Sequence, residues 1–274
     1  MITKLLSRRT VKTIEETLDP KEIFQLIHTK QGDYTQENIE EFTCRDRAGM
    51  ALSFLTVGRV TEIFGGNKHR RVYVSGLKPD PYDKKNWIEE KCGKHPGLNT
   101  ENLEDTGQFI IIKNMTVVKR SQKIIDKYGT QAAKRSRLRF PLQKGLYNNI
   151  FNDQLVPFTW LVREYLQRYA PTQGKLFSYQ DCWAWHIIRH YTGMFPNWFR
   201  AQADRFYGYH ITKDSLRHSK FVGRVKPESS APYIKYSDDQ DLKDQTAIMD
   251  FDWIDSAVEE IQERLSFHKN KSQV

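Results

Sequence analysis

Long apolar runs are absent from the 274-residue sequence, and no stretch approaches the roughly 20 uninterrupted apolar residues that a membrane helix requires. We therefore expect no membrane partner. Cysteine is scarce: Cys44, Cys92 and Cys182 lie far apart, without a CxxC pair or a histidine at ligand spacing. This pattern excludes a disulfide framework and a zinc site, so we expect buried thiols, no metal and no cofactor. The opening residues MITKLLSRRTVKTIEE lack the apolar segment of a secretory signal, and we expect an intracellular protein.

Acidic residues are outnumbered, with 34 Asp and Glu against 43 Lys and Arg, a formal net charge of +9. The excess is uneven along the chain. Residues 113–139 hold nine basic side chains and one acid, whereas residues 237–264 hold ten acids and two bases. A basic strip of this kind suits a polyanion such as nucleic acid, although a solvated basic face is also common in proteins without such a partner.

Hydrophobic periodicity predicts an α+β protein that is mostly helical, with a small antiparallel sheet. A Pro at the first turn opens a helix after Asp19, and the apolar run GMALSFLTV places a buried helix within 37–57. Further helical patterns cover 156–170, 181–193, 195–208, 212–223 and 249–266. The strand patterns are RRVYVSGL, QFIIIKNMTVVKR and SRLRFPL. We divide the chain into an N-terminal arm (1–18), one domain (19–236) and an acidic tail with an amphipathic helix (237–274).

Four short motifs follow one another inside the predicted domain. They are a helix ending in GRVTE, a lysine-bearing hairpin before SRLRFPL, the helical PNWFRA and the late segment VGRVKPESSAPYIKY. Their order and spacing over residues 19–236 resemble the catalytic domain of tyrosine recombinases, the lambda-integrase family, in its archaeal and viral integrase form. The resemblance implies a mostly helical recombinase fold that cleaves and rejoins DNA through a 3′-phosphotyrosine, without metal or ATP.

The first motif of the resemblance places a catalytic arginine at Arg59, with Glu62 in the family's supporting position. The catalytic lysine of the family lies on a hairpin after an apolar strand. We assign it to Lys119, with Lys113 as the second choice, because this basic strip offers several lysines.

The second arginine requires a choice between Arg189 and Arg200. HIIR at 186–189 matches the family's His-x-x-Arg literally, but Arg200 lies 24 residues before Arg224, close to the family's interval, whereas Arg189 lies 35 before it. We therefore assign Arg200 and place Asn197 in the histidine position. The segment containing His186 and Arg189 becomes an ordinary amphipathic helix, with Trp183 and Ile187 expected in the core.

The last motif supplies the nucleophile. Tyr233 stands nine residues beyond Arg224, which occupies the position of the family's second His or Trp, and Tyr236 is the alternative one helical turn later. The resemblance implies that Tyr233 attacks the phosphate, Arg59 and Arg200 bind its nonbridging oxygens, and Lys119 protonates the leaving oxygen. The basic side chains expected to contact DNA are Lys113, Arg120, Lys123, Arg135, Arg137 and Arg139.

The departures at Asn197 and Arg224 leave a second interpretation open, a DNA-binding protein of the same fold with impaired catalysis. A third class, an RNA-binding or ribosome-associated basic protein, explains the charge but not the spacing of the motifs. For the recombinase we expect double-stranded DNA as partner and a homo-oligomer, a tetramer on two duplexes. We expect the apolar stripe Phe251, Ile254, Val258 and Ile261 of the last helix to dock on a neighbouring protomer, with docking on its own chain as the alternative.

Overall fold

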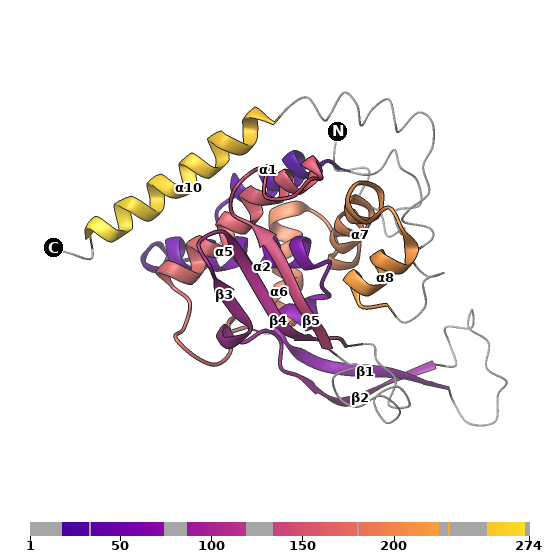
Figure 1. The fold of residues 1–274 in the computed structure, drawn as a ribbon. Helices are drawn as coiled ribbons and strands as arrows, with labels where there is room; N and C mark the ends of the chain where they lie inside the picture. The colour runs from indigo at the N-terminus through magenta and orange to yellow at the C-terminus, as the bar shows by residue number, and fades with distance from the viewer. Residues whose placement is uncertain are drawn as a thin grey trace.

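The computed structural model describes residues 18–32, 34–73, 87–118, 134–179, 181–224, 230 and 251–271, and it is an α+β fold in which helices pack around small antiparallel sheets (Figure 1). The α-helices described are α1 (Pro20–His28), α2 (Ile39–Thr56), α3 (Val60–Phe64), α5 (Val156–Arg168), α6 (Asp181–Thr192), α7 (Pro196–Phe206), α8 (Ser215–Val222) and α10 (Asp252–Lys271). Short 3-10 segments η3 (Gln36–Asn38), η5 (Thr100–Asn102) and η7 (Ile150–Leu155) and the π-helical η8 (Tyr207–Thr212) connect them. Within this part of the chain no helix is long and apolar enough to cross a membrane.

Helix α2 forms the centre of the core. Met50 and Phe54 lie on one face of the helix and Leu52 on the opposite face, yet all three are fully buried, as expected for a helix that is covered on all sides. The ring of Phe54 stacks on Phe158 of α5 at 4.5 Å between centroids. The predicted buried helix within 37–57 is thus confirmed, and its last residue is followed by Val57 in the left-handed conformation.

The strands form two separate sheets rather than the single sheet expected from the sequence. β1 (Gly66–Tyr73) pairs with β2 (Trp87–His95) in an antiparallel ribbon that projects from the body (Figure 1). β3 (Leu103–Asp105), β4 (Phe109–Thr116) and β5 (Lys134–Pro141) form the other sheet in that order. β2 and β3 were not predicted, because neither segment shows an apolar alternation.

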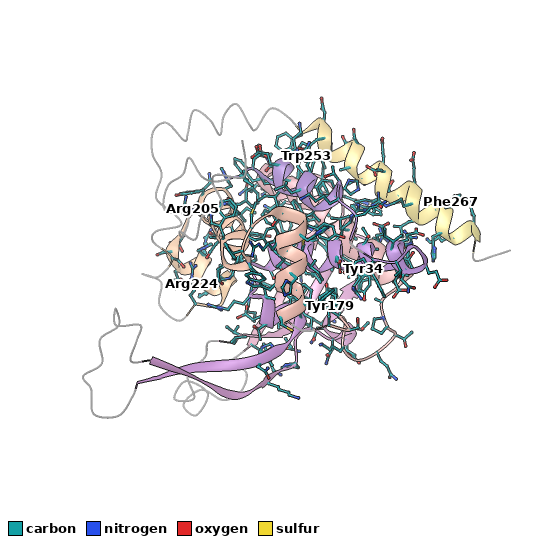
Figure 2. The ribbon with its side chains drawn as sticks, turned by 180° about the vertical axis from the view of Figure 1, so that it is seen from behind. Tyr34, Tyr179, Arg205, Arg224, Trp253 and Phe267 are labelled. Carbon is teal, nitrogen blue, oxygen red and sulfur yellow. The ribbon has the colours of Figure 1, made fainter. Side chains whose placement is uncertain are left out.

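The C-terminal helix α10 docks on its own chain, which corrects the expected docking on a neighbouring protomer. Ile254 and Ile261 are fully buried in the common core, and α10 packs along α5 (Figure 1). The ring of Trp253 lies 5.6 Å from that of Phe24 in α1. Phe267, near the end of the helix, is 62% exposed (Figure 2).

Two side-chain predictions are wrong. Trp183 was expected in the core with Ile187, but α6 turns only Ile187 inward and Trp183 is 49% exposed. The three cysteines were expected to be buried. Cys44 is buried, Cys182 is exposed, and the side chain of Cys92 lies outside the described residues.

Candidate active site

Arg59 and Glu62 are held together at the start of α3, directly after the central helix ends. One carboxylate oxygen of Glu62 accepts from the Arg59 backbone N–H at 2.9 Å, and the other accepts from its guanidinium at 2.9 Å. The second oxygen also accepts from the backbone N–H of Val118 at 3.1 Å. Although burial raises the pKa of Glu62, Arg59 and these N–H donors hold it below its usual value. Glu62 therefore fixes Arg59 and ties it to the strand that precedes Lys119.

The last turn of α2 presents two backbone carbonyls to further arginines. Arg135 donates to the carbonyl of Thr56 at 2.5 Å, and Arg200 donates through Nε to the carbonyl of Val57 at 2.8 Å. The final carbonyls of a helix have no partner within it, so guanidinium groups are suitable donors. Val57 has a φ of 51°, an uncommon value for a β-branched residue, and this conformation ends the helix at the arginines.

Electrostatic coupling shows that these arginines share one environment. Burial lowers the pKa of Arg135 to about 10, and among its neighbours Arg200 and Arg59 lower it further. Burial likewise lowers the pKa of Arg200, which is also influenced by Asp204, Arg59, Glu62 and Arg224. Neighbouring arginines thus add to the effect of burial on Arg135 and Arg200, and a bound anion would offset this repulsion.

Arg224 joins the group through a buried network on α7 and α8. It pairs with Asp204 and donates to the hydroxyl of Ser230 at 3.0 Å. The other oxygen of Asp204 lies 2.7 Å from Nε2 of His218, whose Nδ1 is 3.1 Å from the hydroxyl of Thr212. His218 and Asp204 are almost completely buried, so this network fixes the guanidinium of Arg224 in place.

We call Arg59, Arg135, Arg200 and Arg224 the arginine cluster. Its four guanidinium groups share two buried carboxylates, Glu62 and Asp204, which leaves an excess of positive charge. The side chains of Arg59 and Arg224 are 25% and 12% exposed, so the cluster is reachable from solvent. Chemically, such a site suits a phosphate group, whose oxygens match the forked guanidinium donors.

The remaining predicted residues fall into three groups. Asn197 is exposed in the first turn of α7, one turn before Arg200, and makes no hydrogen bond to the described residues. Arg137 and Arg139 are exposed on β5, and Lys113 pairs with Glu104 at 2.7 Å on the neighbouring strand. Lys119, Arg120, Lys123, Tyr233 and Tyr236 lie outside the described residues.

One predicted DNA contact requires correction. Arg135 was grouped with Arg137 and Arg139 as a surface residue, but it is 4% exposed and its guanidinium lies 5.4 Å from the ring of Phe221 in α8. The packing of α8 against β5 removes this arginine from the surface and places it in the arginine cluster.

The literal His-x-x-Arg segment lies elsewhere. His186 and Arg189 are exposed on α6, and Arg189 stacks over the rings of Trp185 and Phe195. Both line a separate pocket to which Tyr34 also contributes. Figure 2 shows Tyr34 well away from Arg224. The geometry thus groups Arg200, and not Arg189, with Arg59.

The sequence interpretation missed Asp204 and His218. Asp204 follows Arg200 by four residues, a helical spacing that puts both on one face of α7. His218 carries no comparable local signal, because its partner is 14 residues away.

Comparisons of the chain with protein-family models, with curated proteins and with solved structures found no match. Within the described residues no group of His, Cys, Asp or Glu could hold a metal ion. The chemistry of the site therefore has to be argued from its own residues.

Proposed function

We propose that the chain is a site-specific DNA recombinase or integrase of the tyrosine recombinase type. The observation that supports this most strongly is the convergence of Arg59, Arg200 and Arg224, which lie far apart in the sequence and were selected by motif spacing. A basic protein of another class would need no shared site for these three. In this proposal the cluster binds the scissile phosphate of double-stranded DNA and stabilises the charge that develops on it.

Chain connectivity brings the two reactive groups of the proposal to the same place. Lys119 directly follows Val118, whose N–H is bound by Glu62. Tyr233 is three residues beyond Ser230, so their Cα atoms lie within about 11 Å of each other. Ser230 in turn accepts from Arg224. Lys119 and Tyr233 therefore belong to chain segments that start at residues bound to the arginine cluster or its carboxylates.

The proposed reaction is a reversible transfer of the phosphodiester. The Tyr233 hydroxyl attacks phosphorus, a bond forms between the tyrosine oxygen and the 3′-phosphate, and the bond to the 5′ oxygen breaks. Lys119 supplies the proton to that oxygen, and a 5′ hydroxyl from a second duplex reverses the step. Because the phosphotyrosine bond conserves the energy of the phosphodiester, the cycle consumes no ATP. Exchange between two duplexes implies a homo-oligomer, for which we propose a tetramer.

Covalent trapping tests the proposal. A nicked duplex carrying the target site is incubated with the protein and analysed on a denaturing gel. We expect an adduct with the wild type and with Tyr236→Phe, and none with Tyr233→Phe, which should still bind DNA because only the hydroxyl is removed. An adduct that persists in Tyr233→Phe and is lost in Tyr236→Phe would move the nucleophile by one turn.

The same experiment addresses the second interpretation, a DNA-binding protein of this fold without catalysis. The exposed Asn197 favours it, since an amide cannot transfer protons as histidine does. Duplex binding without an adduct would support this interpretation. Binding should in either case weaken with salt, with a log-log slope of about −0.9 for each phosphate contacted. A slope near zero would contradict both.

A further inference from the structure

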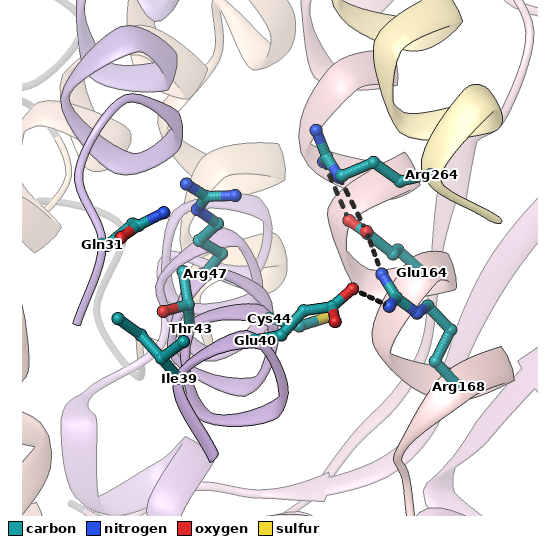
Figure 3. Close-up of a pocket in the computed structure, with 9 residues that line it drawn as sticks. All are labelled: Gln31, Ile39, Glu40, Thr43, Cys44, Arg47, Glu164, Arg168 and Arg264. Atoms are coloured by element: carbon teal, nitrogen blue, oxygen red, sulfur yellow. Dashed lines mark hydrogen bonds and ion pairs between the residues drawn. The ribbon is translucent and has the colours of Figure 1, made fainter. Parts of the chain in front are cut away.

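A second concentration of arginines surrounds a pocket between α2, α5 and α10, away from the arginine cluster. The pocket has a volume of about 180 Å³ and is lined by Arg47, Arg168 and Arg264 together with Glu40 and Glu164 (Figure 3). Arg47 precedes the end of α2 by nine residues, or about 14 Å along the helix axis. The pocket is thus a separate feature of the fold.

Two of the three arginines are fully matched by carboxylates. Glu164, which is 3% exposed, accepts from Arg168 at 3.0 Å and from two nitrogens of Arg264 at 2.8 and 3.0 Å. Arg168 pairs in addition with Glu40 (Figure 3), and Arg264 pairs with Glu260 at 3.0 Å. The carboxylates around the pocket are therefore already used by these two arginines.

Arg47 is the arginine that remains without a carboxylate among the described residues. Its guanidinium donates to the backbone carbonyl of Lys30 at 2.9 Å, while its buried Nε has no hydrogen-bond partner within the described part of the chain. Burial lowers the pKa of Arg47, and Arg264 lowers it further. A buried donor without an acceptor is costly, because the Arg47 Nε has given up its water without gaining another partner.

His28 lies beside the same arginines, and they affect its pKa. Its Nε2 lies 3.1 Å from Nη1 of Arg264, and its pKa falls to about 4 because of burial together with Arg47 and Arg264. The imidazole is thus neutral at pH 7. Gln31 and Thr43 add polar side chains to the pocket wall. The walls therefore combine an arginine that has no carboxylate partner among the described residues with hydrogen-bonding groups, in a space of several water volumes.

We propose that this pocket binds a small tetrahedral oxyanion of the phosphate type, held by Arg47. The anion would supply the acceptor that the Arg47 donors lack and would lie between α2 and α10. Because Arg264 belongs to α10, a bound anion would add an attractive contact between the C-terminal helix and the body of the fold. The oxyanion could be free phosphate or a phosphate of the DNA backbone, and the experiment separates these sources.

Binding of inorganic phosphate to the full chain is measured by calorimetry at constant ionic strength in chloride. We expect saturable binding to the wild type, binding at least about tenfold weaker in Arg47→Gln, and unchanged binding in Arg217→Gln, an exposed arginine on α8 with the same change in charge. Arg47→Lys, which retains the charge, should bind with intermediate affinity. Thermal unfolding of each variant is measured without phosphate, which verifies that it is folded, and then with increasing phosphate.

Two outcomes would overturn the proposal, and a third would assign the oxyanion to the DNA backbone. Equal phosphate binding by the wild type and Arg47→Gln would show that the ion binds elsewhere. A linear rise in melting temperature with phosphate, shared by all variants, would show general salt exclusion instead of a site. If phosphate does not bind but Arg47→Gln weakens duplex binding while Arg217→Gln does not, the pocket contacts the DNA backbone and takes no free ion.

Discussion

Glu62 connects three parts of the proposed active site, and replacing it with glutamine tests that connection with little change in shape. Its carboxylate accepts from the backbone and guanidinium of Arg59 and from the backbone of Val118. In Glu62→Gln the amide oxygen can retain the bonds to the guanidinium and to Val118. The amide NH₂ then faces the backbone N–H of Arg59, so two donors meet and the ion pair is lost.

The expected cost follows from this geometry. Hydrogen bonds to a charged group contribute about 1.5–3 kcal/mol each, so losing one and weakening two should lower the free energy of unfolding by about 3 kcal/mol at pH 7. Glu62 is 1% exposed, but Arg59 is 25% exposed and stays partly hydrated. The cost should therefore lie near the lower end of the 3–5 kcal/mol, roughly, for breaking a fully buried pair.

The pH dependence of the free energy of unfolding tests the contribution of Glu62 independently. The pKa of Glu62 is lower in the folded state than its ordinary value of 4.5, so its contribution is present above that value and is lost as the pH falls through the folded-state pKa. Urea unfolding between pH 7 and pH 3 should show this acid loss in the wild type. It should be smaller in Glu62→Gln and unchanged in Glu259→Gln, an exposed carboxylate on α10.

The rate of DNA cleavage should also fall in Glu62→Gln. Freeing Arg59 and the strand before Lys119 misplaces two proposed catalytic groups, and a misplacement of about 1 Å can cost about 10²-fold in rate. The reasoning would be refuted if the free energy of unfolding of Glu62→Gln lay within about 0.5 kcal/mol of the wild-type value and fell by the same amount between pH 7 and pH 3. It would show that this buried carboxylate does not organise the site.

Three further predictions concern other parts of the molecule. Arg200→Ala should lower single-turnover cleavage by about 10²- to 10³-fold, whereas Arg189→Ala should change it by less than about twofold; the reverse result would move the site to α6. Ile261→Ala should cost about 2–5 kcal/mol in guanidinium unfolding because Ile261 is fully buried, whereas the exposed Ser256→Ala should cost under about 0.5 kcal/mol; equal effects would mean that α10 does not dock as described. Burial raises the pKa of Asp46 from 3.8 to about 6, so the contribution of this group is greatest below pH 4 and falls by about 3 kcal/mol as the pH rises through 6. Asp46→Asn should remove that fall in urea unfolding from pH 4 to pH 7, and a persistent fall would assign it to another group.

Local patterns in the sequence were sufficient for most helices. Asp19 and Pro20 predicted the start of α1, and Asp19 indeed caps that helix through a reciprocal pair of bonds with Glu22. The strands depended on distant pairing. β2 contains mainly charged and polar residues and pairs with β1 in a projecting ribbon. Its sequence therefore has no apolar alternation from which a strand could be predicted.

The sequence predicted only those site residues that belong to the recognised motifs. Arg59, Arg200 and Arg224 could be selected by spacing, but the contacts that position them could not. Asp204 bonds to His218 only because η8, which contacts both α7 and α8, brings their side chains together, and Arg135 becomes buried only when α8 covers β5. An amphipathic stripe likewise predicts that α10 docks without indicating on which chain.

The contacts of α10 with α1 also bear on how the protein acquires its structure during synthesis. Phe24 packs against Trp253, and His28 contacts Arg264 across 236 positions of the sequence. The apolar faces of α1 and α5 that α10 covers therefore stay exposed until α10 is synthesised, several seconds after α5 at about 5–20 residues per second. The core should be completed only when α10 has left the ribosome, and nascent chains lacking α10 should be the ones that chaperones retain.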